Sequence, residues 1–382
     1  MTTMYARIIK PPKSSFFLLG MRGTGKSYWV KDTFKKAKFF DLLNETDFQR
    51  YLTDLSLFAD ELRLLPKGSW VVIDEVQRLP QILNEVHRAI EEHGLKFALL
   101  GSSARKLKRV GVNLLGGRAL SRVMYPLLPD ELKDDFSLES ALHYGTLPLI
   151  VSSPDQRDQL EGYLKLYLRE EIQLEALVRN LPGFARFLPI AGLFHGQTIN
   201  VSELARSAGV ARTTVDGYLD ILEDTLLCYK LPAYEAKLRV KERTHPKLYW
   251  IDNGVARAAK GSLNKPTAEE RGALFEGFIA MLLRAGKDLS FCDYDSLAYW
   301  APPGGNTEVD FILTRGKEKI AIEVKSAKEP GSTELKGLKA IGELSGIKRR
   351  ILVYPGKRDR LTQDKIEILG IETFLRQLSS GL

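Results

Sequence analysis

The sequence has 382 residues, which predicts two or three domains rather than one. With 44% hydrophobic and 27% charged residues, it has the composition of an ordinary soluble globular protein that can bury a core in each domain. The formal net charge of +8 favours a polyanionic partner without naming one, and a basic enzyme that binds no nucleic acid fits the same charge.

The cysteines and the apolar runs exclude two further classes of protein. The two cysteines, Cys228 and Cys292, are far apart and lack metal-ligand spacing, so neither a disulfide framework nor a zinc site is expected. The N-terminal residues contain no apolar core of a signal peptide, and no apolar run approaches the length that crosses a bilayer. We therefore predict a cytoplasmic protein without membrane association.

The first chemically informative stretch is 20–27, which reads GMRGTGKS and directly follows the apolar run 16–19. This spacing is typical of a phosphate-binding loop, in which glycines let backbone N–H groups surround phosphates. Lys26 would contact the β- and γ-phosphates, and the Ser27 hydroxyl would bind Mg²⁺. A glycine-rich turn with a chance lysine is the alternative, but a strand before and an amphipathic segment after the loop favour nucleotide binding. The predicted nucleotide contacts are Gly20, Gly23, Thr24, Gly25, Lys26 and Ser27.

A second apolar run, 70–75, ends in the acids Asp74 and Glu75. A buried parallel strand places such carboxylates at the ligand-binding edge of an α/β sheet. Asp74 would hold Mg²⁺, and Glu75 would act as the general base on the attacking water. The alternative is a strand end that precedes a capped helix. The short strand expected at 38–43, together with the adjacent Asp and Glu, indicates the additional-strand branch of P-loop proteins, which hydrolyses ATP.

Two later positions are candidates for contacts with the γ-phosphate. The apolar run 96–101 ends in Ser102 and Ser103, whose hydroxyls would sense that phosphate, although capping of a following helix explains them equally well. Arg118 would act in trans on the nucleotide of a neighbouring subunit, with Arg105 as the second choice. The alternative for Arg118 is a surface arginine or one of several phosphate contacts.

Several of these strings resemble a known family. They are VIDEVQ at 72–77, LGSS at 100–103, Gly117-Arg118, and Pro126-Leu127. The chain is similar to prokaryotic AAA-type ATPases that carry a C-terminal domain of unknown function, near the archaeal-type and STAND-like ATPases. The resemblance spans the chain and implies an all-helical lid after the ATPase core. The sequence PDE at 129–131 departs from the Ser-Phe-Glu-like run of these relatives.

The middle of the chain predicts helices over about 130–190, followed by a helix-turn-helix over 200–215. In that motif Ala205 is small where two helices cross, Gly209 supplies a positive-φ turn, Val215 packs back, and Ser202 is the expected N-cap. The run 226–232 resembles a hairpin wing. The second helix begins with residues that suit DNA, but its later turns are acidic, so direct DNA contact and a scaffold or protein-binding role both stay open.

The C-terminal part matches the D…E-x-K core of restriction-endonuclease-like nucleases. Asp310 lies in one predicted strand, Glu323 and Lys325 lie on one face of the next strand, and Glu276 lies in an upstream helix. The acids Asp310 and Glu323 would bind Mg²⁺, and Lys325 would position the attacking water or stabilise the developing negative charge. The alternative is an inherited nuclease fold now used for binding. Asp252, which ends another strand, is expected to be a turn or cap residue.

Together these features predict an α/β protein: a P-loop additional-strand (AAA+/STAND-like) ATPase core, a helical lid, a winged helix-turn-helix and a restriction-endonuclease-like domain. The expected boundaries are 1–128, 129–185, 186–240 and 241–382. We expect ATP and Mg²⁺ as cofactors, DNA as a partner, and a homo-oligomer such as a hexamer; a protein partner stays open. ATP turnover would drive or gate the nuclease-like domain. The alternatives are a STAND-like switch and a branch-migration motor, in both of which the C-terminal domain binds without cutting.

Overall fold

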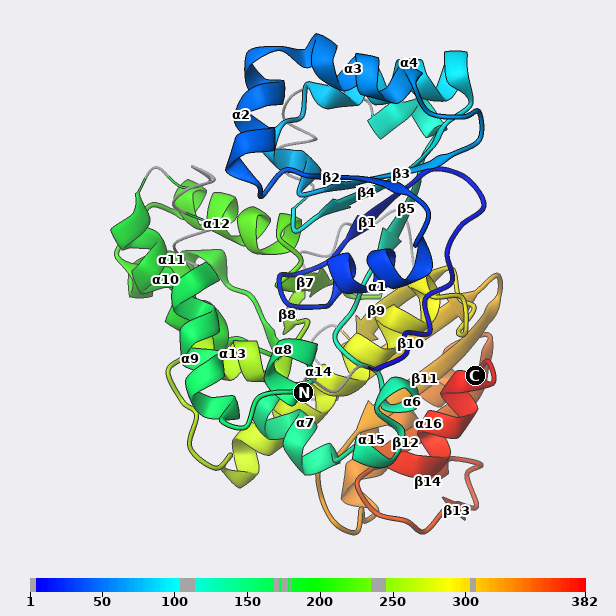
Figure 1. The fold of residues 1–382 in the computed structure, drawn as a ribbon. Coiled ribbons are helices and arrows are strands. Elements are labelled where there is room, and N and C mark those ends of the chain that lie inside the picture. Colours follow the sequence, from blue (N-terminus) through cyan, green and yellow to red (C-terminus); the bar gives the residue numbers. More distant parts are fainter. Residues whose placement is uncertain are drawn as a thin grey trace. The chain divides into compact units, whose positions relative to one another are not determined.

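The computed structural model describes residues 5–103, 114–167, 172, 178, 180–234, 245–302 and 307–382, and divides into two compact units (Figure 1). Unit 1 comprises Met1–Leu127, Leu147–Leu149 and Ile221–Leu227, and unit 2 comprises Leu128–Thr146, Ile150–Asp220 and Cys228–Leu382. Arg105, the second choice for the arginine that acts in trans, lies outside the described residues. Within the residues that the structure describes, no helix combines the length and apolar character needed to cross a membrane.

Unit 1 is built on a five-stranded sheet in which every neighbouring pair of strands is parallel. The spatial order is β2-β3-β4-β1-β5, so β4 lies between the strand before the phosphate loop and the acidic strand. This order matches the additional-strand arrangement that the sequence predicts. The strands are β1 (Phe16–Leu19), β2 (Lys38–Asp41), β3 (Trp70–Asp74), β4 (Lys96–Gly101) and β5 (Leu120–Val123).

The helices of unit 1 cover both faces of this sheet because side chains alternate along each strand. Phe16 packs against Trp29 and Phe34 at and after helix α1, whereas its neighbour Phe17 belongs to the core cluster that includes residues of α3 and α4. A parallel sheet buried on both faces explains the continuously apolar strands. The helical segments are α1 (Lys26–Thr33), α2 (Glu45–Thr53), α3 (Leu55–Arg63), η1 (Val76–Arg78), α4 (Ile82–His93) and η2 (Leu114–Gly117).

Unit 2 begins with helices and a small antiparallel sheet. The helical segments are α6 (Pro129–Leu132), η3 (Lys133–Asp135), α7 (Leu138–Tyr144), α8 (Pro148–Val151), α9 (Gln156–Tyr167), α10 (Leu181–Leu193), α11 (Val201–Ala208), α12 (Arg212–Asp224) and α13 (Asn253–Ala259), of which α8 and α12 also contribute residues to unit 1. The sheet has the order β6-β8-β7, with β6 (Gln197–Thr198), β7 (Cys228–Leu231) and β8 (Lys247–Trp250).

Helices α11 and α12 occupy the positions of the two predicted helices, and Gly209 between them has the expected positive φ of 63°. Ala205 and Val215 are buried as expected. The predicted N-cap was wrong: Asn200, not Ser202, caps α11, and its side chain accepts the N–H groups of Ser202 and Glu203. Asparagine caps a helix as well as serine does, and here it precedes the first helical residue.

The C-terminal half of unit 2 is a six-stranded mixed sheet in the order β13-β14-β12-β11-β10-β9. The predicted strand pair is the antiparallel hairpin of β10 and β11, and β11 then pairs in parallel with β12. The strands are β9 (Ser296–Trp300), β10 (Val309–Arg315), β11 (Glu318–Val324), β12 (Ile347–Tyr354), β13 (Arg360–Leu361) and β14 (Glu367–Gly370). The helical segments are α14 (Ala268–Asp288), η5 (Thr333–Leu335), α15 (Lys336–Ala340), η6 (Ile341–Glu343) and α16 (Ile371–Ser379).

Candidate functional sites

The loop between β1 and α1 has the backbone that a phosphate cradle requires. Gly23 and Gly25 have φ values of 83° and 88°, a region in which only glycine is unstrained, and α1 begins directly after Gly25 at Lys26. A side chain at Gly20 would place its Cβ 2.6 Å from the carbonyl oxygen of Met124. The loop therefore needs these three glycines for its conformation, and it presents backbone N–H groups at a helix N-terminus.

Two basic side chains form hydrogen bonds to carbonyl oxygens of this loop. The buried Lys26 donates from Nζ to the carbonyl oxygens of Gly20 at 2.7 Å and Met21 at 3.2 Å, so its ammonium lies over the loop. Arg7 donates to the carbonyl oxygens of Thr24 at 2.6 Å and Tyr125 at 2.7 Å. Arg7 thus ties the loop to the residues after β5 and adds a second positive charge near the phosphate position.

The carboxyl end of β3 brings Asp74 to this loop, and Asp41 at the end of β2 is paired with Asp74 in the sheet. Asp74 is buried at the end of β3 and accepts a hydrogen bond from the Ser27 side chain. Burial raises the pKa of Asp74, the negative charge of Asp41 adds to this effect, and the hydrogen bond from Ser27 and the charge of Lys26 oppose it. The structure therefore brings together Lys26, Ser27 and Asp74, which the sequence assigns to the nucleotide and its metal ion.

Glu75, the predicted general base, is linked to the predicted sensor serine through Gln77. The Gln77 side-chain amide donates to the Glu75 carboxylate and, at 3.1 Å, to Ser102 Oγ at the end of β4. Because a carboxylate only accepts, the amide nitrogen of Gln77 must face Glu75. Glu75 also has a positive φ of 56°, which is uncommon for a non-glycine residue and recurs at functional sites.

The other two candidates of unit 1 are Ser103 and Arg118. Ser103 is buried directly after Ser102. Arg118 follows η2, and its guanidinium forms an ion pair with Glu91 near the end of α4. Its side chain is 40% exposed, which leaves it accessible to another molecule. The role of Arg118 in trans stays a prediction.

In unit 2 the predicted nuclease-like residues converge on one cavity of about 560 Å³. Glu276 comes from α14, Asp310 from β10, Glu323 from β11 and Lys325 from the residue after β11. Asp310 Oδ2 accepts the backbone N–H of Val324 at 2.8 Å, which fixes the two strands in this register. Lys325 Nζ lies 2.5 Å from Glu323 Oε1. The helix and the hairpin thus place the four predicted side chains together.

Two further residues of this cavity were not predicted. The side-chain oxygens of Glu276, Glu308 and Asp310 lie within 4.8 Å of one another, a spacing that suits a metal ion. The buried Lys247 of β8 forms ion pairs with all three acids, at 2.8 Å from Glu276 Oε1 and 3.5 Å from Asp310 Oδ1. Tyr249, on the same strand, donates from its hydroxyl to Glu276.

Two carboxylates of the cavity, Glu276 and Glu323, have strongly raised pKa values. Burial, reinforced by the charge of Asp310, raises the pKa of Glu323 to about 8. The same two causes raise the pKa of Glu276 to about 7, against the opposing effect of Lys247. Glu323 Oε2 is buried and has no hydrogen-bond partner within the described part of the chain. Oxygen donors of this kind suit Mg²⁺ or Mn²⁺, which would bring charge that offsets the repulsion among the acids.

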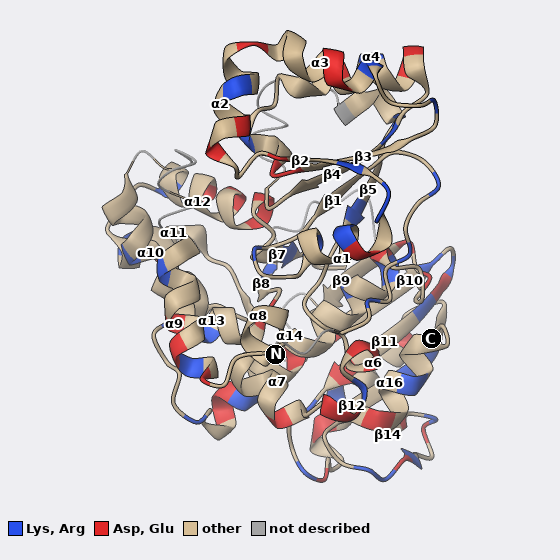
Figure 2. Cartoon of the chain, in the orientation of Figure 1, with Lys and Arg blue, Asp and Glu red and all other residues tan. Residues whose placement is uncertain are grey.

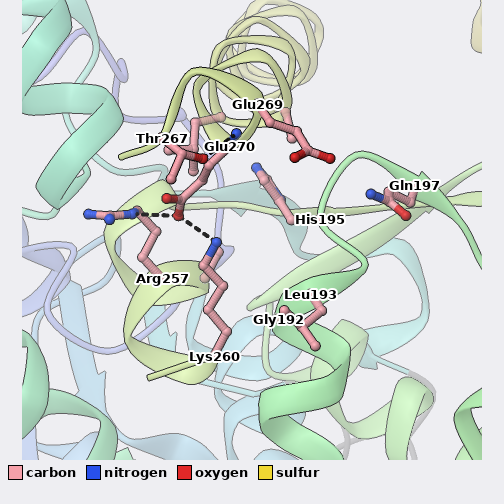
Figure 3. A pocket seen from close by; sticks show the side chains of 12 residues that line it. Gly192, Leu193, His195, Gln197, Arg257, Lys260, Thr267, Glu269 and Glu270 are labelled. Atoms are coloured by element: carbon pink, nitrogen blue, oxygen red, sulfur yellow. Dashed lines mark hydrogen bonds and ion pairs between the residues drawn. The ribbon is translucent and has the colours of Figure 1, made fainter. Parts of the chain in front are cut away.

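A second cavity of unit 2, of about 290 Å³, holds charged groups that pair with each other (Figure 3). Glu270 lies between Arg257 and Lys260 and forms ion pairs with both. Arg257 is fully buried and also donates to the carbonyl oxygens of His143 and Asn264. This network joins α13, α14 and the end of α7, so we interpret it as structural.

Comparison with protein-family models assigns three successive segments. Residues 12–133 match the model described as an AAA domain. The structure of this segment has the expected parallel sheet, phosphate loop and acidic strand. Residues 12–133 form an AAA-type P-loop domain. Residues 135–266 match the domain of unknown function DUF8612, and residues 271–374 match the domain of unknown function DUF4143.

Curated relatives match this chain over most of their length. Uncharacterized proteins of Mycobacterium tuberculosis and Mycobacterium bovis are each 26% identical over 349 residues, which cover 89% of this chain and 76% of theirs. An uncharacterized protein of Haemophilus influenzae is 23% identical over 367 residues, covering 91% and 83%. The similarity therefore extends well beyond the segment that matches the AAA domain, to proteins whose names describe no activity.

Similarity to solved structures is weak. The replication initiator DnaA bound to AMPPCP and single-stranded DNA has a TM-score of 0.27 at 14% identity, covering 56% of this chain and 83% of that one. The Aeropyrum pernix ORC1 protein in complex with DNA has a TM-score of 0.25 at 15% identity, covering 72% and 89%. TM-scores this low do not establish a shared fold, so the AAA-type domain rests on its sequence match and its sheet.

Four residues that matter to these sites escaped prediction from the sequence. Arg7 is 17 residues from Thr24, and no motif connects them. Gln77 lies two residues after Glu75 in the sequence. Its hydrogen bond to Ser102 forms because β3 and β4 are neighbours in the sheet. Glu308 lies two residues before Asp310 and is not part of the D…E-x-K spacing. Lys247 comes from β8, far from the nuclease-like motif, so no local spacing could indicate it.

Proposed function

We propose that this chain is an ATP-hydrolysing AAA-type protein that acts on DNA, in which ATP turnover drives or gates a Mg²⁺-dependent, restriction-endonuclease-like site in unit 2. The AAA-domain match and the geometry of the phosphate loop support the ATPase part. The cavity formed by α14, β10 and β11 supports the nuclease part, and the net charge of +8 is compatible with a DNA partner.

In the ATPase site, each residue would have a distinct role. Backbone N–H groups of the loop and Lys26 would bind the phosphates, while Ser27 and Asp74 would hold Mg²⁺, which supplies charge neutralisation when bound. Glu75 would take the proton of the attacking water, and Ser102 would contact the γ-phosphate. Arg118 would complete the site of a neighbouring subunit, which is why we propose a homo-oligomer.

In the nuclease-like site, Asp310 and Glu323 would hold the metal ion together with nearby carboxylates, and a bound metal would lower the pKa of a water molecule. Lys325 would orient that water or stabilise charge on the phosphate, because its ammonium already lies beside Glu323. Helices α11 and α12 with the β6-β8-β7 sheet would form the winged helix-turn-helix. The acidic later turns of α12, visible in Figure 2, make only its first turn suitable for a phosphate contact.

The observation that carries the nuclease proposal is the convergence of Asp310, Glu323, Lys325 and Glu276 on one cavity. A buried oxygen of Glu323 has no hydrogen-bond partner among the residues that the structure describes. The test is cleavage of labelled duplex, single-stranded, forked and four-way-junction DNA in Mg²⁺ or Mn²⁺. We expect the wild type to cut at least one substrate.

The matched variants are Lys325→Ala at the site and Lys328→Ala on the following segment. Lys325→Ala should lose cutting by about a hundredfold or more, because a positioned acid, base or cation typically contributes that much. Lys328→Ala should cut like the wild type. Absence of cutting on every substrate, in a preparation that hydrolyses ATP, would reject the nuclease.

One observation favours a second candidate function. Lys247 already forms ion pairs with three acids of the cavity. Such pairing is expected of an inherited nuclease fold that binds without cutting. In that case ATP would control partner binding, as in a STAND-like switch, or would drive branch migration of DNA. ATP-dependent strand displacement that survives Glu323→Ala would identify the motor. ATP-dependent capture of a partner without DNA cleavage would identify the switch.

A further inference from the structure

The acidic cavity of unit 2 already contains a cationic group supplied by the chain itself. The ammonium of Lys247 pairs with Glu276, Glu308 and Asp310 at the same time. These are the three acids whose oxygens lie within 4.8 Å of one another. The ammonium therefore occupies the place where the three carboxylates would share a metal ion.

The donor set around Lys247 is the kind that a small divalent cation prefers. All three partners are carboxylates, and Glu323 lines the same cavity, with its buried Oε2 lacking a hydrogen-bond partner in the described chain. An ammonium and a divalent cation held by the same oxygens would repel each other strongly in a buried site. The two cations should therefore exclude one another.

The strand that supplies Lys247 belongs to a different part of unit 2 from the strands that supply the acids. Lys247 is the first residue of β8, which pairs with β6 on one side and β7 on the other. Strand β6 directly precedes α11, and β7 follows α12. A displacement of this small sheet would thus withdraw the ammonium from the acids. Glu308 is 41% exposed and leaves an open side for its exit.

We propose that Lys247 is a built-in competitor of the metal ion: its ammonium holds the position among Glu276, Glu308 and Asp310, and a divalent cation binds only when the Lys247 side chain leaves. The inference rests on the proposed nuclease-like site and describes its regulation. It also assigns Glu308 as a metal ligand, a role that the D…E-x-K spacing does not predict.

The test measures Mn²⁺ binding to the full chain without ATP or DNA, with free Mn²⁺ quantified by electron paramagnetic resonance. Lys247→Met removes the charge and keeps the length of the side chain. We expect this variant to bind Mn²⁺ about tenfold more tightly than the wild type. The apparent affinity of the wild type is lowered because only the fraction of molecules whose site is free of the Lys247 ammonium can bind the ion. Glu308→Gln should bind about tenfold more weakly, the effect expected from loss of a ligand or its support.

Two controls isolate the position of the charge. Lys336→Met removes a lysine that lines the same cavity. Within the described residues no ion pair joins Lys336 to the three acids, so the affinity of this variant should stay close to that of the wild type. Asp310→Asn should lose the proposed metal site. Mn²⁺ that this variant still binds is bound elsewhere on the chain, and this amount is subtracted from the binding of the other proteins. If Lys336→Met tightened binding as much as Lys247→Met, a general charge effect would replace the proposal.

A second readout uses the wild type and does not depend on whether Lys247→Met folds. Acylation of lysines by acetic anhydride, followed by mass spectrometry, should modify Lys247 faster in Mn²⁺ than without it, because the displaced side chain becomes accessible. Equal rates in both conditions would overturn the proposal, as would an unchanged affinity in folded Lys247→Met.

The outcomes separate this inference from the proposed function. Tighter Mn²⁺ binding by Lys247→Met without any DNA cleavage would support the competitor and reject the nuclease. Cleavage by the wild type with unchanged Mn²⁺ affinity in Lys247→Met would do the reverse.

Discussion

Gln77 connects the proposed general base of the ATPase site, Glu75, to Ser102, which would contact the γ-phosphate. Its two amide hydrogens go to Glu75 and Ser102, which lie after neighbouring strands of the sheet. The glycines, lysine and acids of this site could be predicted because they lie within short local motifs. The role of Gln77 could not be predicted, since it follows from the pairing of β3 with β4.

At the residue scale, Gln77→Leu should lower kcat for ATP hydrolysis about tenfold and leave KM nearly unchanged, because the substitution frees Glu75 without touching the phosphate loop. Steady-state hydrolysis assays give both constants. Gln81→Leu, an exposed change four residues later, is the control and should behave like the wild type. A rise in KM with unchanged kcat would show that Gln77 acts on nucleotide binding instead.

At the element scale, helix α14 positions Glu276 and meets β8 through His195. Gly277, next to Glu276, has no room for a side chain, since a Cβ there would lie 2.0 Å from His195 Nε2. The helix was expected from its apolar pattern, as was the β10–β11 hairpin. Neither pattern indicates which helix residue a distant strand approaches. The contacts of Lys247, Tyr249 and His195 with α14 therefore become visible only in the folded structure.

Gly277→Ala should therefore destabilise the chain by about 2 kcal/mol, the usual cost of overpacking a core. Gly272→Ala, one and a half turns earlier on α14, meets nothing closer than 3.7 Å and should be neutral or stabilise by about 0.5–1 kcal/mol. Denaturant unfolding of both variants measures the difference. Equal stability of the two would contradict the close packing of α14 on His195.

His195 also predicts a pH dependence of stability. Its Nδ1 accepts the backbone N–H of Trp250, its Nε2 lies 3.1 Å from Asn253 Oδ1, and burial lowers its pKa to about 4. The folded state therefore resists protonation that the unfolded chain accepts below its ordinary value of 6.5. This contribution to stability is complete above pH 6.5 and is lost as the pH falls towards 4.

The free energy of unfolding, measured by urea titration from pH 7 to pH 4, should fall more steeply in the wild type than in His195→Gln. The variant should start from a lower stability at pH 7, because it loses ring packing against Tyr249. Parallel slopes in the two proteins would show that His195 remains neutral in both states or protonates equally in both.

At the scale of the whole molecule, two candidate sites with different chemistry lie in separate units of one chain. Unit 1 carries the phosphate loop and unit 2 carries the carboxylate cavity. The sequence predicted the AAA-type domain well because its motifs are contiguous. It predicted Asp310, Glu323 and Lys325 of the second cavity from their strands, and Glu276 from an upstream helix. It missed Glu308 and Lys247, whose roles depend on how distant segments pack.

The central claim is that ATP turnover gates the second site, and the most direct measurement is the rate of Mg²⁺-dependent DNA cleavage with and without ATP in the wild type and in Lys26→Ala. We expect ATP to raise the wild-type rate by about tenfold or more, as a coupling of 1–3 kcal/mol allows, and to have no effect on Lys26→Ala. Lys325→Ala should cut in neither condition. Cleavage at one rate with and without ATP, unchanged in Lys26→Ala, would contradict the claim.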